Sequence, residues 1–256
     1  MSEWDPNLYL KFENERTQPV KDLIFHIKKE NPGRIIDIGC GPGNSTNELK
    51  KRWGKAHIIG LDNSKTMLDK ANSDYPYLDW VQYDARGDLS FLGKFDIVFS
   101  NAAIQWMADQ KSLLEKLFAM LHDNGLLAVQ LPNPTYMPIN IAVLDTAEDE
   151  RWQDRFKDID DGLICNELSY YYNALSPLTK DIELWETYYY HVVPGHEAII
   201  DWYKSTGMKP FLARLDESEK DEFAQEVLSK IQTEYKTQED GNVLFPFRRL
   251  FFIAHK

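Results

Sequence analysis

The sequence predicts an α/β protein: a seven-stranded mixed sheet, mostly parallel with an antiparallel edge hairpin, and helices on both faces. In residues 1–132, short β-branched apolar runs alternate with helical patterns, and this alternation is typical of a parallel sheet. The first run, Ile35–Ile38, leads straight into the glycine-rich segment Gly39–Gly43. Two later apolar segments, Glu183–Val193 and Phe247–His255, suit the antiparallel edge pair that mixed sheets commonly carry.

The expected elements of the first half follow one another at close intervals. We expect strands at residues 35–38, 57–61, 80–83, 95–100 and 126–131, and helices at residues 44–53, 65–72 and 112–121. Asn44 or Ser45 is expected to cap the first of these helices. The pair Asn124-Gly125 is expected to end the third helix before the fifth strand begins.

The second half has a different character, because Pro132, Pro134 and Pro138 interrupt the alternation. Residues 139–161 look helical, and two further helices are expected at about 197–206 and 218–235. We interpret the chain as one domain whose helical segments cover the carboxyl ends of the parallel strands. Its expected parts are an N-terminal cover segment at 1–30, a ligand-binding core at 31–132, helical cover insertions at 133–182 and 194–242, and edge strands at 183–193 and 247–255.

Charge and composition exclude several classes of function. The 256 residues include 29 Lys and Arg against 41 Asp and Glu, a net charge of −12, which argues against binding nucleic acid or an anionic membrane through a basic face. Residues 1–132 carry 16 basic and 18 acidic groups, and residues 133–256 carry 13 and 23, so most of the acidic excess lies in the second half. Two cysteines, Cys40 and Cys165, make neither a disulfide framework nor a zinc spacing. No apolar signal core and no run of ~18 apolar residues is visible, so we expect a cytoplasmic protein without a metal.

The segment Gly39-Cys40-Gly41-Pro42-Gly43 carries the strongest functional signal. A strand runs into three glycines at alternate positions, where glycine permits positive φ and close approach of a ligand, and a helix follows. The alternative is a plain strand-to-helix turn. The spacing is G-x-G-x-G rather than the G-x-G-x-x-G of dinucleotide binders, and a proline stands inside the loop. We therefore predict a Rossmann-like sheet that binds a ligand with an amino-acid portion instead of a pyrophosphate.

Polar residues follow the ends of the next three strands. Asp62 comes 19 positions after Gly43 and is expected to accept hydrogen bonds from both hydroxyls of a ribose; the alternative is a turn residue or helix cap. The pair Asp84-Ala85 follows the third strand, where a side chain can hydrogen-bond an adenine amino group. Asn101 follows the fourth strand, next to the expected reacting centre.

Together these motifs resemble those of the class I S-adenosylmethionine-dependent methyltransferases. The residues that carry the resemblance are Asp37, Gly39, Gly41, Gly43, Asp62, Asp84, Phe95-Asp96-Ile97-Val98 and Asn124-Gly125. Further blocks extend the likeness, nearly end to end, to those members of the family that methylate trans-aconitate. These blocks are Trp4-Asp5-Pro6, Leu8-Tyr9-Leu10, Phe12, Arg16, Asn44-Ser45-Thr46, Asn101-Ala102, Gln105-Trp106, Tyr189-Tyr190-His191, His196, Ala198–Trp202, Thr206-Gly207 and Arg249-Leu250-Phe251. The glycine loop is common to the whole superfamily, and the end blocks are the specific part.

The resemblance implies which residues bind S-adenosylmethionine. The implied set is Asp37, Gly39, Cys40, Gly41, Gly43, Asp62, Asn63, Met67, Asp84, Ala85, Asn101 and Gln105. The glycines would line the methionine portion, and Asp62 would take the ribose, with Asn63 and Met67 beside the adenosine. Asn101 would lie under the sulfonium, with Gln105 just beyond.

The implied reaction transfers a methyl group to a carboxylate of a small acid such as trans-aconitate, and it gives a monomethyl ester and S-adenosylhomocysteine. Carboxyl groups have pKa values near ~4, so the acceptor oxygen is already deprotonated and no side chain is required as a base. Cations are needed to hold the anion, and arginine grips carboxylates in bidentate fashion. Arg249, in an apolar strand, and Arg16 are our candidates, although Arg16 could instead bind the carboxylate of the cofactor. Strand alternation should turn Arg248 to the opposite face.

Aromatic residues are the other candidates for the substrate pocket. Tyr172, Tyr190 and His191 could donate hydrogen bonds to the substrate, and Trp106 could close over the methyl group. Core packing is the alternative for each of them. The triplets at 170–172 and 188–190 are expected in strands, where neighbours point to opposite faces.

Two other functions stay open on the sequence alone. One is methyl transfer to an O, N or C atom of another small metabolite, and the other is a module that binds the cofactor without catalysis. An RNA methyltransferase is disfavoured because no basic stripe is visible, and a nicotinamide dehydrogenase is disfavoured by the glycine spacing. Oligomeric state has no signature in the sequence.

Overall fold

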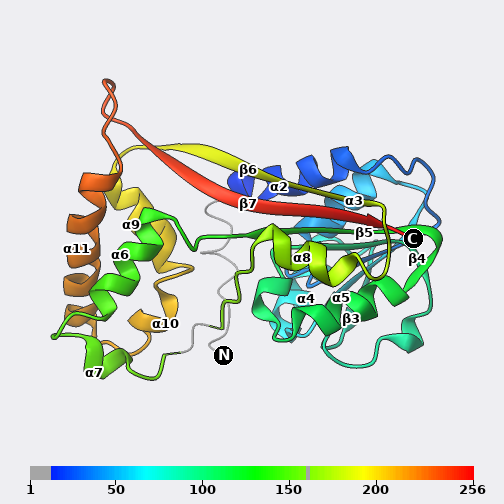
Figure 1. Ribbon diagram of the computed structural model, residues 1–256, viewed down its shortest axis with the longest axis horizontal. Helices are drawn as coiled ribbons and strands as arrows, with labels where there is room; N and C mark the ends of the chain where they lie inside the picture. Colours follow the sequence, from blue (N-terminus) through cyan, green and yellow to red (C-terminus); the bar gives the residue numbers. More distant parts are fainter. Residues whose placement is uncertain (1–12, 160–161) are drawn as a thin grey trace. The chain divides into compact units, whose positions relative to one another are not determined.

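The computed structural model describes residues 13–159 and 162–256, with the backbone alone for residues 13–16. The N-terminal block from Trp4 to Phe12 therefore lies outside the described residues. The chain forms two compact units, the first from residues 1–132, 166–186 and 249–256 and the second from residues 133–165 and 187–248. Two long strands, β6 (Ile182–Val193) and β7 (Val243–His255), begin in one unit and end in the other (Figure 1).

The sheet has seven strands in the order β3-β2-β1-β4-β5-β7-β6, which confirms the predicted mixed sheet. Its parallel strands are β1 (Arg34–Ile38), β2 (His57–Asp62), β3 (Asp79–Gln82), β4 (Phe95–Asn101) and β5 (Leu121–Pro132). β7 pairs antiparallel with β5, so β7 and β6 form one edge. The strand order reverses between β1 and β4, and open α/β sheets bind their ligands outside the carboxyl ends of strands at such a point.

The described helices of the first unit are α2 (Glu13–His26), α3 (Asn44–Arg52), α4 (Lys65–Asp74), α5 (Gln110–Ala119) and α8 (Leu168–Leu175), with short 3₁₀ turns η1 (Ser90–Leu92) and η2 (Ile104–Trp106). Of these, α3, α4 and α5 lie close to the helices expected at residues 44–53, 65–72 and 112–121. α5 begins at Gln110 because the side chain of Asp109 caps it by accepting a hydrogen bond from the backbone N–H of Ser112.

The prediction that Asn124-Gly125 ends the third helix is wrong. α5 already ends at Ala119, and β5 begins at Leu121. The ladder between β4 and β5 is irregular at this point, and Asn124 adopts a left-handed conformation with φ 62°. Asn tolerates this conformation better than most residues, so the pair forms a kink within a strand instead of a helix end.

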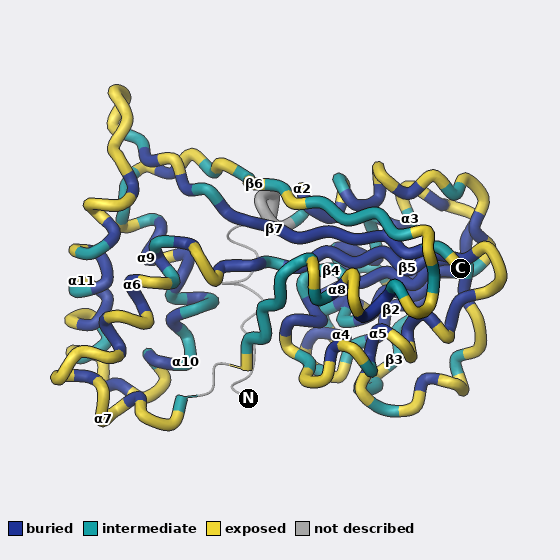
Figure 2. The backbone as a smooth tube through the Cα atoms, viewed as in Figure 1, coloured by how far each residue is buried: buried dark blue, intermediate teal, exposed yellow. Residues whose placement is uncertain are grey.

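The two faces of the sheet carry different side chains. One face is continuously apolar; its strand residues are Ile36, Ile38, Ile59, Leu61, Val98, Leu127, Val129, Leu131, Leu250, Phe252 and Ala254, and α5 packs on them. The other face, which we call the α2 face, carries the alternate strand positions Asp37, Phe99, Asn101, Ala128, Gln130, Arg249, Phe251 and Ile253. α2 packs against β5, and the ring of His26 stacks on Trp185, which stacks on Phe251. Figure 2 shows that the central strands are buried along most of their length.

The triplet Tyr170-Tyr171-Tyr172 lies on helix α8, so the prediction of a strand there is wrong. Tyr171 is fully buried, stacks on Phe252 at 5.1 Å and donates a hydrogen bond from its hydroxyl to Oε1 of Gln110. Burying Tyr171 together with Ala174 and Leu175 requires the i, i+3, i+4 spacing of a helix. The second triplet does lie in a strand, β6.

The second unit is built from helices and the remaining ends of β6 and β7. The helices are α6 (Pro138–Ala147), α7 (Gln153–Phe156), α9 (His196–Lys204), α10 (Lys209–Leu212) and α11 (Glu217–Glu234). The rings of Trp152, Phe156, Phe211 and Phe223 pack together in its core. Ion pairs cross its acidic surface: Arg151 with Glu222 and Glu226, Arg155 with Glu219, and Lys230 with Asp149.

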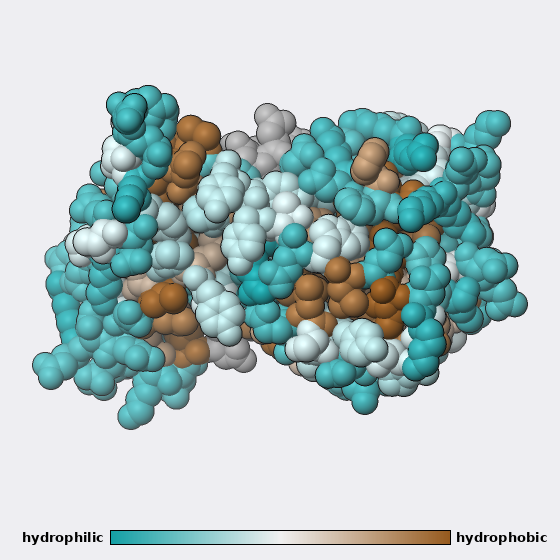
Figure 3. All heavy atoms as spheres, turned by 45° about the horizontal axis from the view of Figure 1, so that its top comes forward, coloured by the Kyte–Doolittle hydropathy of each residue, from teal (hydrophilic) through white to brown (hydrophobic). Residues whose placement is uncertain are grey.

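The face of the molecule seen in Figure 3 is mainly hydrophilic. Figure 3 shows separate apolar patches among hydrophilic side chains. On β6, Tyr188, Tyr190 and Val192 are exposed at alternate positions. Within the described residues, no helix is both long and apolar enough to cross a membrane.

Candidate functional site

The three glycines of the loop after β1 have different surroundings. All three have positive φ: 72° at Gly39, 54° at Gly41 and 91° at Gly43. A Cβ atom at Gly39 would overlap the side chain of Ala103, and one at Gly43 would come within 2.6 Å of the ring of Trp80. A Cβ at Gly41 would meet nothing within 4 Å among the described residues. Gly39 and Gly43 therefore pack against the protein, and Gly41 is the glycine that faces open space.

The backbone N–H groups of the loop are engaged within the protein. Gly39 and Cys40 donate to the carbonyl of Leu61, and Gly41 donates to a carboxylate oxygen of Asp62 at 2.9 Å. The other oxygen of Asp62 accepts from the backbone N–H of Ser64 at 2.8 Å. This arrangement differs from a phosphate cradle, in which several N–H groups point at the ligand. Each carboxylate oxygen of Asp62 retains a second acceptor site, as contacts to two ribose hydroxyls require.

The side chain of Asp37 links the end of β1 to the first turn of α3, on either side of the glycine loop. Its side chain is fully buried, and Oδ2 accepts hydrogen bonds from the hydroxyls of Ser45 at 2.6 Å and Thr46 at 2.7 Å, whereas Oδ1 has no partner among the described residues. Burial raises the pKa of Asp37 to about 6, against the opposing effect of the two hydroxyls. The expected capping of α3 by Asn44 or Ser45 is wrong: Gly43 is the N-cap residue, without a side-chain bond, and the Ser45 hydroxyl binds Asp37 instead.

Replacing Asp37 by Asn is expected to stabilise the fold above pH 6. The pKa of Asp37 is higher in the folded chain than its ordinary value of 3.8, so the carboxyl favours folding at low pH and loses this contribution as pH rises through about 4–6. A shift of this size corresponds to about 3 kcal/mol. Urea unfolding should therefore show a gain for Asp37→Asn of up to about 3 kcal/mol at pH 8 that vanishes toward pH 4. Asp123→Asn, at an exposed position, is the control, and a gain independent of pH would contradict the prediction.

Several predicted cofactor residues have contacts that favour a structural role. Cys40 is buried, and burial, together with the charges of Asp37 and Asp62, raises the pKa of its thiol. Asp84 accepts hydrogen bonds from the guanidinium of Arg86, which lowers the pKa of the carboxyl. Ala85 packs in the core on the apolar face of the sheet.

Two more predicted residues lie on or near α4. Asn63 is exposed, and its backbone carbonyl accepts a hydrogen bond from Gln82. Met67 is buried, with its backbone N–H donating to the hydroxyl of Ser64, the N-cap residue of α4.

The end of β4 holds polar atoms that the described residues leave unsatisfied. Oδ1 of Asn101 and Oε1 of Gln105 are buried and have no hydrogen-bond partner among the described residues. Ala102 follows with φ 51°, and its N–H donates to the carbonyl of Gln130, so the chain turns sharply here. Buried carbonyl oxygens without donors are costly, and a ligand with positive charge or N–H groups would satisfy them.

Gln110 holds this turn in place, and sequence reasoning missed it. Its Nε2 donates to the carbonyl of Ile104 in η2, and its Oε1 accepts from Asn166 at 3.0 Å and from the hydroxyl of Tyr171 at 2.8 Å. The side chain is buried, so it links η2 to α8 rigidly. A buried glutamine at a helix start has no distinctive local pattern, which is why the sequence did not reveal it.

Arg249, one of the candidate substrate-binding residues, is buried on the α2 face. It pairs with Pro132 in the β5–β7 ladder and is 6% exposed. Gln130 lies on the same face, paired with Phe251, and Asn101 is the partner of Gln130 on β4. Asn101, Gln130 and Arg249 thus follow one another across three adjacent strands at the carboxyl edge.

The remaining predicted substrate-binding residues lie on other elements of the chain. Tyr172 is half exposed on α8, whose neighbouring Tyr171 packs on the opposite face of the sheet. Trp106, in η2, is 38% exposed. Tyr190 and His191 belong to the second unit, where Tyr190 is exposed and the ring of His191 lies 5.0 Å from that of Trp202. Arg16 is in α2, and its side chain lies outside the described ones.

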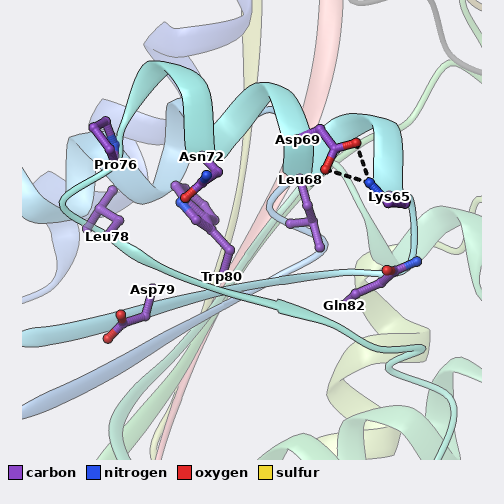
Figure 4. A pocket seen from close by; sticks show the side chains of 9 residues that line it. All are labelled: Lys65, Leu68, Asp69, Asn72, Pro76, Leu78, Asp79, Trp80 and Gln82. Atoms are coloured by element: carbon purple, nitrogen blue, oxygen red, sulfur yellow. Dashed lines mark hydrogen bonds and ion pairs between the residues drawn. The ribbon is translucent and has the colours of Figure 1, made fainter.

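A separate hollow lies beside α4 and β3 (Figure 4). The Lys65–Asp69 ion pair lies on its α4 side, and the side chain of Trp80 points toward the helix beside Asn72. None of the predicted cofactor or substrate residues lines it, so it is not the predicted site.

Comparisons with known proteins agree with this geometry. Residues 35–125 match a family model described as a methyltransferase domain. The chain is 37% identical over 256 residues to a trans-aconitate 2-methyltransferase of Escherichia coli. The alignment covers 100% of this chain and 99% of that protein.

Solved structures share the fold. The YcgJ protein of Bacillus subtilis has a TM-score of 0.63 at 15% identity, covering 93% of this chain and 98% of that one. The phosphoethanolamine N-methyltransferase 2 of Haemonchus contortus, solved with S-adenosyl-L-methionine, has a TM-score of 0.55 at 17% identity, covering 93% of this chain and 52% of that one. The full-length similarity to the Escherichia coli enzyme, the glycine loop and the sheet order all agree. The chain belongs to the S-adenosylmethionine-dependent methyltransferases, in the family of the trans-aconitate 2-methyltransferases.

Proposed function

We propose that this enzyme methylates a carboxylate of a small acid, trans-aconitate or a similar one, to give a monomethyl ester and S-adenosylhomocysteine. The full-length relative at 37% identity bears the name trans-aconitate 2-methyltransferase. The observation that carries the proposal is Arg249, a buried cation on the same face and at the same edge of the sheet as Asn101. A buried arginine is the residue type best suited to bidentate recognition of a carboxylate.

The first unit offers a fitting place for the cofactor. When bound, S-adenosylmethionine would supply an electrophilic methyl carbon for transfer from its sulfonium sulfur to a carboxylate oxygen, with S-adenosylhomocysteine as the leaving group, and the oxygen would need no prior deprotonation. Gly41 leaves open space for the methionine portion, and Asp62 has acceptor sites for the ribose. The unsatisfied oxygens of Asn101 and Gln105 suit a cation, because buried acceptors without donors create a negative potential.

The residues of this site would then act by binding the acid and the cofactor and orienting them toward each other. Arg249 would hold the acid, and Asn101 would hold the cationic end of the cofactor beside it. Positioning two reactants in line supplies a large part of the rate acceleration in such transfers. A carboxylate needs no base at neutral pH, so we propose no side chain as a proton acceptor.

The protein carries a net charge of −12, which repels an anionic substrate at long range. Long-range attraction is not expected from such a protein. Affinity must come from short-range contacts, which are screened least when buried. This agrees with a buried arginine as the main anchor and predicts only a weak dependence of substrate affinity on salt.

Incubation with methyl-labelled S-adenosylmethionine and trans-aconitate tests the proposal. We expect one labelled ester per S-adenosylhomocysteine formed, and alkaline hydrolysis should release the label as methanol. Turnover on amines or phenols but not on acids would overturn the substrate class. Cofactor binding without turnover on any metabolite of a broad panel would instead favour a binding module.

A further inference from the structure

Gln130 is a fully buried polar residue of the first unit whose side chain lacks hydrogen bonds to the described residues. Its side chain is 0% exposed, and neither Nε2 nor Oε1 has a hydrogen-bond partner among the described residues. Its neighbours along β5, Ala128, Val129 and Leu131, are apolar. A buried carboxamide with both atoms unsatisfied is unfavourable for folding alone, so the residue calls for a ligand-binding explanation.

The position of Gln130 indicates what that ligand is. Asn101 is its register partner on β4, so the two side chains leave the same face of the sheet, with Cα atoms about 4.8 Å apart. On the other side, β7 carries Arg249 on this face, two residues before the partner of Gln130, Phe251. Gln130 therefore lies between the residue proposed for the cofactor cation and the residue proposed for the substrate anion.

The chemistry of a carboxamide suits a position between a cation and an anion. Its N–H group can donate to an anion, and its carbonyl oxygen can face a cation or a donor. Oδ1 of Asn101 and Oε1 of Gln105, two buried side-chain atoms without a partner among the described residues, are both acceptors. Gln130 adds a side-chain N–H donor beside these acceptors.

We propose that Gln130 is a substrate-binding residue that holds the acceptor acid next to the cofactor. Its Nε2–H donates to a carboxylate oxygen of the acid, and its Oε1, like Oδ1 of Asn101, faces the positively charged end of the cofactor. This inference rests on the proposed function, since it requires an acid as the methyl acceptor.

Binding measurements with two variants test the inference. Gln130→Met keeps the side-chain volume and removes both polar atoms, and Gln130→Glu keeps an acceptor but adds a negative charge. Calorimetry would give the Kd of trans-aconitate on enzyme saturated with S-adenosylhomocysteine, and separately the Kd values of S-adenosylmethionine and S-adenosylhomocysteine. Gln225→Met and Gln225→Glu, on the exposed side of α11, are matched controls, and thermal melts verify that all variants fold.

The two variants should differ in a characteristic way. For Gln130→Met, the Kd of the acid rises about tenfold, the loss expected for one hydrogen bond to a charged group, while that of S-adenosylhomocysteine stays within about twofold. For Gln130→Glu, the acid binds more weakly still, whereas S-adenosylmethionine binds more tightly relative to S-adenosylhomocysteine, which lacks the sulfonium charge. These opposite changes distinguish a ligand contact from a packing effect.

Three results would overturn the inference. An unchanged Kd for the acid in both variants would exclude Gln130 from the acid site. An equal loss for the acid and both cofactor forms would indicate a packing role. If the unmodified enzyme binds no acid, the proposed function itself fails, and this failure is distinguishable because it precedes any substitution.

Discussion

Replacing Arg249 by Met is expected to lower kcat/KM for trans-aconitate by more than about a hundredfold. Removing one partner of a buried charge pair typically costs about 3–5 kcal/mol, and 1.4 kcal/mol corresponds to a factor of ten. Arg249 is buried on the α2 face, beyond Gln130 and Asn101, so the expected loss concerns the acid and not the cofactor. Steady-state kinetics with trans-aconitate, together with the Kd of S-adenosylhomocysteine, measure the two effects separately.

Two further variants sharpen this experiment. Arg249→Lys retains the charge and loses the bidentate fork, so its kcat/KM should lie between those of the Met variant and the unmodified enzyme. Arg214→Met, at the exposed end of α10, should leave both quantities unchanged. An unchanged kcat/KM for Arg249→Met, or an equal loss of cofactor affinity, would remove Arg249 from the substrate site. Methyl transfer to another metabolite would then be the better interpretation.

Single alanine substitutions in the glycine loop are expected to lower mainly stability at Gly39 and mainly cofactor affinity at Gly41. At Gly39 the added Cβ would overlap Ala103, and φ is 72°, so the free energy of unfolding should fall by about 3 kcal/mol or more from strain and overpacking together. At Gly41 the added Cβ would meet none of the described residues within 4 Å, so we expect the left-handed conformation alone to lower the free energy of unfolding, by about 1 kcal/mol. The methyl group would instead occupy the open space assigned to the cofactor.

Urea unfolding and calorimetry with S-adenosylhomocysteine test this pair. Gly41→Ala should fold normally and bind the cofactor at least about tenfold more weakly, because the backbone can no longer be approached closely. Gly54→Ala is the matched control: the nearest atom to its Cβ would be at 3.8 Å, an ordinary contact. Equal losses of stability at Gly39 and Gly41, or unchanged cofactor affinity in Gly41→Ala, would contradict the distinction.

Much of the first unit was predictable because its signals are local. The strands around Ile35–Ile38 and the loop Gly39–Gly43 follow from short apolar runs and glycine spacing, and the structure has both at the expected positions. The parallel arrangement of the central strands follows from the alternation of strand and helix, whereas their order in the sheet is known only from the structure. Tyr171 is a residue whose secondary structure could not be predicted from local signals. Three consecutive tyrosines favour a strand by propensity, and the packing of Tyr171 against Phe252 in the folded chain favours a helix instead.

The sequence by itself determined the fold class, the loop after β1 and the family resemblance, since these depend on residues adjacent in the chain. The tertiary structure decided which glycine faces open space, that Asp37 is buried with a raised pKa, and that Gln130 shares a face with Asn101 and Arg249. These properties depend on strand register, burial and hydrogen-bond partners distant in the chain. No local pattern encodes such partners, because the satisfaction of a buried polar atom is decided only when the strands are assembled.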